Sequence, residues 1–170
     1  MHKTYTLPYK RKRLGKTNYR SRLKLIKSKT TRLVIRRSNK HLFVQAVNYD
    51  QDGDKVLTVA HTKELIKLGW KFNTKNISAA YLCGLLFGKK WKGKETLIPD
   101  IGQYTSVKGC KLYALIKGIV DAGIKVAHSP EVFPSEERIN GSHIANYGKV
   151  KNAKEIKNNF TEVKKKIMGA

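Results

Sequence analysis

The sequence predicts an α/β protein in which helices flank a mixed five-stranded β-sheet and a basic arm precedes it. Three observations lead to this fold class. The first 49 residues carry 15 lysines and arginines but no aspartate or glutamate, which sets the start of the chain apart. Three strand-type segments with short connections follow its first part. Helical and strand-type segments then alternate, and this order favours a sheet covered by helices.

The arm is expected to span residues 1–30. Residues 1–16 show almost no apolar periodicity, so on their own they should be disordered and should fold on binding a partner. Thr17 or Asn18 can cap a short helix that follows. The apolar side chains of this helix are spaced to share one face: Tyr19, Leu23 and Ile26.

Five segments should form the sheet. Strand-type residues concentrate at Arg32–Ser38, Leu42–Tyr49, Lys55–Ala60, Thr96–Ile101 and Ile124–Ala127. Short turns join the first three segments, which predicts an antiparallel meander. The last two should join the sheet through right-handed crossovers. Pro99 lies inside the fourth segment, where it weakens the expected pairing because proline has no N–H to donate.

Four helices are expected around this sheet. Helical periodicity or capping residues mark Thr62–Lys67, Ile77–Lys90, Gly109–Ala122 and Ala153–Met168. Thr62 and Asn76 are the expected caps of the first two. The second is apolar nearly all round and contains small residues, which is typical of a helix buried against a sheet or another backbone. The last carries an apolar stripe and many lysines, so we expect a globular domain at 31–128 and an irregular segment with a basic C-terminal helix at 129–170.

The charge distribution predicts a polyanionic partner. The net charge is +24, of which the first 49 residues contribute +15 and the remaining 121 contribute +9. Seven of the eight arginines fall in the first 40 residues, and arginine binds phosphate bidentately and stacks on bases. No apolar run reaches the roughly 20 residues that span a bilayer, so no membrane contact is expected. The chain also opens without the apolar segment of a signal peptide.

Catalytic and metal-binding motifs are not expected. The sequence contains no phosphate-binding glycine-rich loop, no His-Glu-x-x-His and no nucleophile elbow, and it calls for no cofactor. Cys83 and Cys110 both lie in apolar helical patterns, as buried thiols do in a reducing cytosol. Asp100 could meet Asp50 or Asp54 in space, so an RNA-processing enzyme that uses clustered carboxylates is one alternative. A nonspecific polyanion-binding protein is another.

Three basic clusters favour RNA as the partner. The clusters Lys10–Arg22 and Arg36–His41 combine cations with hydroxyl, amide and aromatic groups, which contact phosphates, 2′-hydroxyls and bases. The third, Lys89–Lys94, includes Trp91, which could stack on a base or pack back on the core.

Several runs of the chain resemble a known family, the 5S-rRNA-binding protein of the large ribosomal subunit (family eighteen) in its archaeal form. The resemblance is carried by Gly15–Ser28, Arg32–Tyr49, Ala79–Lys90, Leu112–Gly123 and His128–Tyr147. It implies a non-catalytic protein with a ribonuclease-H-like topology, strand order 3-2-1-4-5 and an antiparallel second strand. The family commonly has aspartate where this chain has Asn18, a change that keeps the capping role possible.

The resemblance also implies partners and a location. Members bind 5S rRNA and help to anchor it to 23S rRNA in the central protuberance, next to other large-subunit ribosomal proteins, in the cytoplasm. The residues expected to bind rRNA, from the clusters and the resemblance together, are Tyr9, Lys10, Arg11, Lys12, Arg13, Lys16, Thr17, Asn18, Tyr19, Arg20, Arg22, Arg32, Arg36, Arg37, Ser38, Asn39, Lys40, His41, Lys89 and Lys90.

Overall fold

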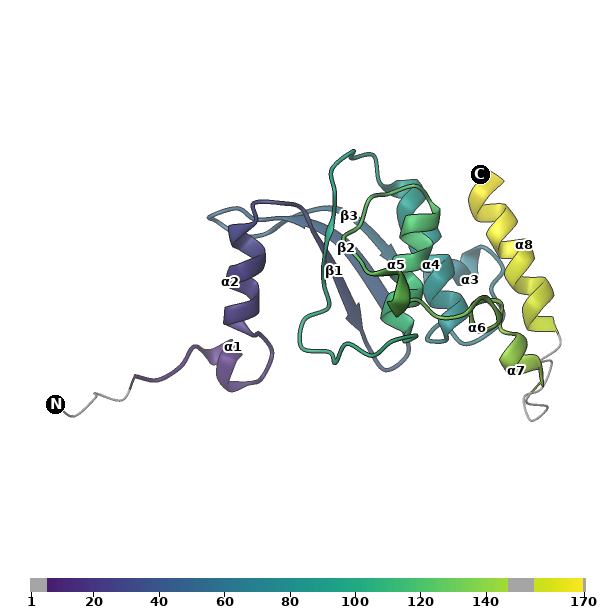
Figure 1. The fold of residues 1–170 in the computed structure, drawn as a ribbon, viewed down its shortest axis with the longest axis horizontal. Helices are drawn as coiled ribbons and strands as arrows, with labels where there is room; N and C mark the ends of the chain where they lie inside the picture. The colour runs from purple at the N-terminus through teal and green to yellow at the C-terminus, as the bar shows by residue number, and fades with distance from the viewer. Residues whose placement is uncertain (1–5, 147–154, 170) are drawn as a thin grey trace.

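The computed structural model describes residues 6–146 and 155–169 (Figure 1). The sequence predictions for residues 1–5, for Tyr147 and for the first two residues of the C-terminal helix lie outside these ranges. In Figure 1 the N-terminal helices lie at one end of the molecule and the C-terminal helix lies at the other, with the sheet between them. None of the helices in the described ranges is long and apolar enough to cross a membrane.

The expected antiparallel meander is confirmed. The strands are β1 (Arg32–Arg37), β2 (Leu42–Asn48), β3 (Lys55–His61) and β4 (Ile98–Asp100). Their order in the sheet is β3-β2-β1-β4, with β1–β2 and β2–β3 antiparallel and β1–β4 parallel. The fold is therefore α/β with a mixed sheet.

The sheet has four strands within the described residues, not the five expected. The segment Ile124–Ala127 makes only one parallel bridge, between Val126 and Leu97. The N–H of Leu97 donates to the carbonyl of Lys125 at 2.9 Å, and alternate residues of a strand point to the same side. The next nitrogen on that side belongs to Pro99 and has no hydrogen, so the ladder stops there. The ribonuclease-H-like topology, which needs this fifth strand, stays a prediction.

Pro99 nevertheless fits within β4. It pairs in register with Leu33 of β1, and the N–H of the preceding Ile98 donates to the carbonyl of Thr31 at 3.1 Å. The proline ring nitrogen therefore faces away from β1 and breaks no bond of that pairing.

Two helices cover one face of the sheet and meet at unusually close range. They are α4 (Ile77–Lys90) and α5 (Lys111–Asp121), and both contribute fully buried residues to the core. A Cβ atom on Gly84 would lie 2.2 Å from the carbonyl oxygen of Leu115, and one on Gly118 would lie 2.2 Å from that of Tyr81. The crossing therefore requires glycine on both helices, which explains the small residues of the expected buried helix.

Of the two caps expected for the helices around the sheet, one is confirmed. Asn76 caps α4 by accepting the N–H of Ala79 at 2.7 Å. The prediction that Thr62 caps α3 (Glu64–Lys67) is wrong. Its buried hydroxyl instead bonds the N–H of Leu42 at 3.0 Å and the carbonyl of the same residue at 3.2 Å, where it joins the end of β3 to the start of β2.

The C-terminal helix packs against the body. It is α8 (Glu155–Gly169), and its predicted apolar stripe is buried: Ile156, Phe160, Val163 and Ile167. Asn159 is also buried, and its amide group donates to the carbonyl of Gly69 at 2.9 Å and accepts the N–H of Lys71 at 3.2 Å. These contacts tie α8 to α4 and to the loop after α3.

A short irregular region connects α5 to α8. It contains the 3-10 helix Pro130–Val132, α6 (Glu136–Asn140) and α7 (Ser142–Asn146). The helical pattern fails over this region in the sequence because prolines and glycine interrupt it. In the structure Pro130 begins the 3-10 helix, and Pro134 and Gly141 lie between the very short helices. Gly141 follows α6 with φ +80°, a left-handed conformation that favours glycine.

Candidate nucleic-acid interface

The described part of the arm contains two short helices, which lie at one end of the molecule (Figure 1). α1 (Lys10–Arg13) is a single turn made only of lysine and arginine, which was not expected from the sequence. α2 (Tyr19–Lys27) follows it. Asn18 caps α2 by accepting the N–H groups of Arg20 at 3.1 Å and Ser21 at 3.2 Å, as predicted.

The side of α2 that approaches the body includes only two of the three apolar residues that the spacing placed on one face. Leu23 was expected to share a face with Tyr19, but it is 55% exposed. The partly buried residues are Tyr19, Arg22, Leu25 and Ile26. The ring of Tyr19 lies 5.4 Å from that of Tyr9, which connects the start of α2 to the residue before α1. The helix turns this way because a charged contact, described next, decides its orientation.

A chain of alternating charges fastens α2 to the sheet. Arg22 binds Asp54 through both terminal nitrogens, at N–O distances of 2.9 and 3.0 Å. The same carboxylate lies 2.8 Å from Nη2 of Arg32 in β1. Asp100, at the end of β4, lies 3.9 Å from Arg32 and 3.1 Å from Arg36. We call these residues the charge chain: Arg22, Asp54, Arg32, Asp100 and Arg36.

Arg32 lies at the centre of the charge chain and is only 2% exposed. Its contact with Asp54 is an ion pair without hydrogen-bond geometry, so Nη2 has no hydrogen-bond acceptor. A buried guanidinium is stabilised only where opposite charges compensate its desolvation, and Asp54 and Asp100 supply them. The structure thus places Arg32 in a supporting position beneath the surface.

Asp54 and Asp100 both form ion pairs with arginines. Burial raises the pKa of Asp54, but its contacts with Arg22 and Arg32 together lower it by more than burial raises it. The pKa of Asp54 therefore lies below its usual value. Asp50 pairs separately with Lys55. Among residues 6–146 and 155–169, no group of three histidine, cysteine or acidic side chains could hold a metal ion. The enzyme alternative required Asp100 to meet Asp50 or Asp54. Asp54 and Asp100 do lie near each other, but the guanidinium that contacts both is that of Arg32, and not a metal ion.

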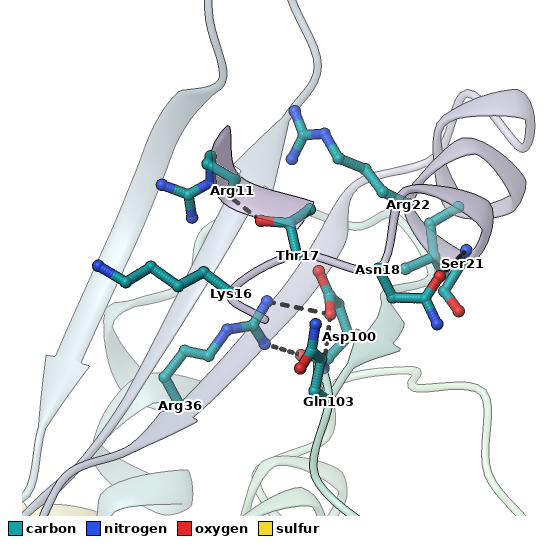
Figure 2. Close-up of a pocket in the computed structure, with 11 residues that line it drawn as sticks. Arg11, Lys16, Thr17, Asn18, Ser21, Arg22, Arg36, Asp100 and Gln103 are labelled. Atoms are coloured by element: carbon teal, nitrogen blue, oxygen red, sulfur yellow. Dashed lines mark hydrogen bonds and ion pairs between the residues drawn. The ribbon is translucent and has the colours of Figure 1, made fainter. Parts of the chain in front are cut away.

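A small cavity lies where the arm meets the charge chain (Figure 2). Its volume is about 120 Å³. Its walls come from the arm, from β1 and from the loop after β4, and they are mostly polar. The lining residues are Arg11, Lys16, Thr17, Asn18, Ser21, Arg22, Leu25, Arg36, Asp100, Gly102 and Gln103.

Hydrogen bonds shape this cavity on both sides. In the arm, Nε of Arg11 donates to the hydroxyl of Thr17 at 2.9 Å. In the body, Nη1 of Arg36 donates to the backbone carbonyl of Asp100 at 2.6 Å, and the carboxylate of Asp100 accepts the N–H of Gly102 at 2.8 Å. Gly102 has φ +68°, and a Cβ atom there would lie 3.0 Å from the Arg36 guanidinium. The side chains of Arg11, Arg36 and Asp100 are therefore held in place before any ligand binds.

The β1–β2 turn presents a second exposed set. Arg37, Ser38, Asn39 and Lys40 are all exposed. The guanidinium of Arg37 lies 4.5 Å from the centre of the Tyr104 ring, and the Tyr104 hydroxyl donates to the carbonyl of Arg37 at 2.8 Å. His41 is partly buried, and its Nδ1 lies 2.8 Å from the hydroxyl of Thr74.

Part of the third predicted cluster bonds within the protein, whereas Lys92 and Lys94 are exposed. Nζ of Lys89 donates to the carbonyl of Ile167 at 2.9 Å, and Lys90 pairs with Glu64. The Trp91 ring stacks on Phe87 with a 12° angle between their planes. Packing on the core is therefore the arrangement that the structure adopts for Trp91, and this cluster does not meet the arm.

The predicted rRNA-binding residues fall into three groups by exposure. The exposed ones are Tyr9, Lys10, Arg11, Lys12, Arg13, Lys16, Asn18, Arg20, Arg37, Ser38, Asn39, Lys40, Lys89 and Lys90. Thr17, Tyr19, Arg22, Arg36 and His41 are partly exposed, and Arg32 is buried. Sequence reasoning missed Gln103 and Tyr104, which lie next to predicted residues. Their only signal is that they follow a strand whose end lies beside Arg36.

Comparisons with known proteins agree on one family. Residues 3–97 match the family described as "Ribosomal large subunit proteins 60S L5, and 50S L18". The chain is 47% identical over 145 residues to the Large ribosomal subunit protein uL18 of Korarchaeum cryptofilum, which covers 84% of this chain and 74% of the relative. It is 44% identical over 166 residues to the Large ribosomal subunit protein uL18 of Methanococcoides burtonii, covering 96% of this chain and 94% of the relative.

Proposed function

The chain belongs to this family of large-subunit ribosomal proteins, in its archaeal form, and from that premise we propose that it binds 5S rRNA and helps to anchor it to 23S rRNA in the central protuberance. Members of the family are structural constituents of cytoplasmic ribosomes, and the protein is accordingly not an enzyme. Its partners are rRNA and neighbouring ribosomal proteins. The finer assignment to 5S and 23S rRNA is our proposal.

The observation that carries this proposal is an acid-free arm fastened to a rigid body. A flexible basic tail would bind any polyanion, because neutralising phosphates releases counterions whatever the sequence. Here the bidentate Arg22–Asp54 contact fixes α2 relative to β1, so the cations of the arm keep a defined spacing. A defined spacing favours one folded RNA surface over others.

We assign different roles to the predicted residues according to their exposure. The exposed cations of the arm and of the β1–β2 turn would contact phosphates and 2′-hydroxyls directly. Arg32 is buried, so it would act by positioning Asp54 and through it Arg22. Lys89 and Lys90 would have to leave their internal acceptors to reach RNA, so we expect them to contribute least.

Competition binding tests the proposal. Labelled 5S rRNA is competed with an unrelated RNA of equal length and with duplex DNA, at about 0.2 M salt because low salt exaggerates nonspecific binding. The full chain should prefer 5S rRNA clearly. A variant in which Lys10, Arg11, Lys12 and Arg13 are all glutamine should lose most of that preference, and its log affinity should depend on log salt with a slope shallower by about 3.

A matched control removes four charges elsewhere on the surface. Lys63, Lys67, Lys125 and Lys157 are exposed and lie outside the arm. Replacing all four with glutamine should leave the preference intact. Equal affinity of the full chain for 5S rRNA and duplex DNA would refute the proposal and favour nonspecific polyanion binding.

A further inference from the structure

We propose that the cavity between the arm and the body is a seat for a single phosphate group of the bound rRNA. This inference rests on the proposed function, because it names the chemical group that arm and body would hold together. The cavity volume of about 120 Å³ is large enough to admit a phosphate group.

The charge of the lining favours an anion. Four cations border the cavity, namely Arg11, Lys16, Arg22 and Arg36, and Asp100 is the one acidic residue that lines it. The carboxylate of Asp100 already faces two arginines and is 12% exposed. The local excess of positive charge is therefore left for a ligand to neutralise.

The arginines at the rim keep free donors after their internal bonds are made. Each guanidinium has five N–H donors in a fixed fork. Arg36 uses three of them, for the carbonyls of Ile35 and Asp100 and for the carboxylate of Asp100. Arg11 uses Nε for Thr17, so its two terminal nitrogens remain. Figure 2 shows the side chains of Arg11 and Lys16 extending from the arm to the same side, while the guanidinium of Arg36 turns from β1 toward Asp100.

The aspartates explain why this seat would be formed in advance. A guanidinium that must be ordered on binding loses rotamer freedom, which weakens the complex. Asp54 holds Arg22 and Asp100 holds Arg36, so that part of the ordering is complete before the RNA arrives. The acids of the charge chain would thus strengthen binding of an anion although they carry negative charge.

The test uses two lysine substitutions in the full-length protein. Lys16→Gln removes a cation that lines the cavity, and Lys24→Gln removes one from the exposed side of α2. Both lower the net charge by one unit and neither residue is buried, so folding is not at risk. We expect 5S rRNA affinity to fall about tenfold for Lys16→Gln, the effect of one charge-assisted contact, and less than about threefold for Lys24→Gln.

Phosphate-ethylation interference identifies the seat directly. The 5S rRNA is sparsely ethylated on its phosphates, and positions where ethylation weakens binding are mapped for each protein. One position that interferes with the unmodified protein should interfere less with Lys16→Gln, because one of the contacts that ethylation blocks is already lost. The same position should still interfere with Lys24→Gln.

A third variant fills the seat. Ser21 is the third residue of α2, a position where glutamate stabilises helices, so Ser21→Glu places a carboxylate in the cavity without unfolding the arm. Its affinity for 5S rRNA should fall at least tenfold, whereas Thr161→Glu, with the same charge change on α8, should have little effect.

The outcomes separate the two proposals. Equal losses for Lys16→Gln and Lys24→Gln, with an unchanged interference map and a preserved preference for 5S rRNA, would overturn the seat and leave the proposed function standing. The absence of any preference for 5S rRNA in the unmodified protein would overturn both.

Discussion

Replacing Gly84 with alanine should destabilise the protein even though alanine is the better helix former. The substitution adds one methyl group in the middle of α4, where it meets the backbone of α5. The new Cβ atom would lie 2.2 Å from the carbonyl oxygen of Leu115, and real Cβ contacts essentially never fall below 3.0 Å. The two helices must therefore separate by at least 0.8 Å, the difference between these distances.

The cost follows from the packing that this separation disrupts. A gap of about 0.5–1 Å forfeits a quarter to a half of each dispersion contact across it, and overpacking of cores costs about 1–3 kcal/mol or more. Backbone atoms cannot move aside as side chains do, so we take about 3 kcal/mol. The higher helix propensity of alanine offsets about 1 kcal/mol of this cost. The net loss is about 2 kcal/mol, which lowers Tm by roughly 4–8 °C in a protein of this size.

Thermal and urea unfolding followed by circular dichroism measure this loss. Gly169→Ala is the control, because a Cβ atom there meets nothing within 4 Å. It should change stability by less than about 0.5 kcal/mol. Because one separation relieves both close contacts, Gly84→Ala and Gly118→Ala together should cost less than the sum of the two. A Gly84→Ala protein as stable as the unmodified one would refute the reasoning.

Three further results are expected. The depressed pKa of Asp54 means that its ion pairs stabilise the fold above the unfolded-state pKa of about 3.9 and that this stability is lost as pH falls through the folded pKa; urea unfolding should therefore show Asp54→Asn less stable by about 1–2 kcal/mol at pH 7, with the difference shrinking as pH falls below about 3.9. Phe160→Ala should cost about 3 kcal/mol in the same assay because the ring is 3% exposed between α8 and α4, and a loss below 1 kcal/mol would mean that α8 is not part of the core. A thiol reagent should modify Cys110 in the folded protein but spare Cys83, whose pKa is raised by complete burial, until the protein is unfolded in urea; rapid native modification of both would contradict the packing of α4.

Features that depend on neighbouring residues could be predicted from the sequence. The caps at Asn18 and Asn76 are local, because the side chain bonds backbone groups two or three residues later. The buried stripe of α8 follows from helical spacing alone. The meander follows from short turns between strand-type segments. In each case the feature depends on residues that are close in the sequence, so the local pattern is enough to predict it.

Features that depend on distant residues could not be predicted. The spacing placed Leu23 on one face with Tyr19 and Ile26, but Arg22 decides which side of α2 meets the body by binding Asp54, 32 residues away, and Leu23 is left exposed. Thr62 looked like a helix cap until its partner proved to be Leu42. The candidate interface shows the same division. Its cations were evident from the charge distribution, whereas the acids that hold them come from separate parts of the chain.

Pro99 has a consequence for the free protein before it joins its partners. The outer edge of β4 is three residues long, and the one backbone nitrogen that faces outward belongs to this proline. A second chain can add a strand to an edge strand, because the exposed N–H groups of the edge donate hydrogen bonds and its exposed carbonyls accept them. Because this edge offers no donor, a second chain cannot form a complete backbone ladder along β4, and this edge of the sheet resists pairing between copies of the protein.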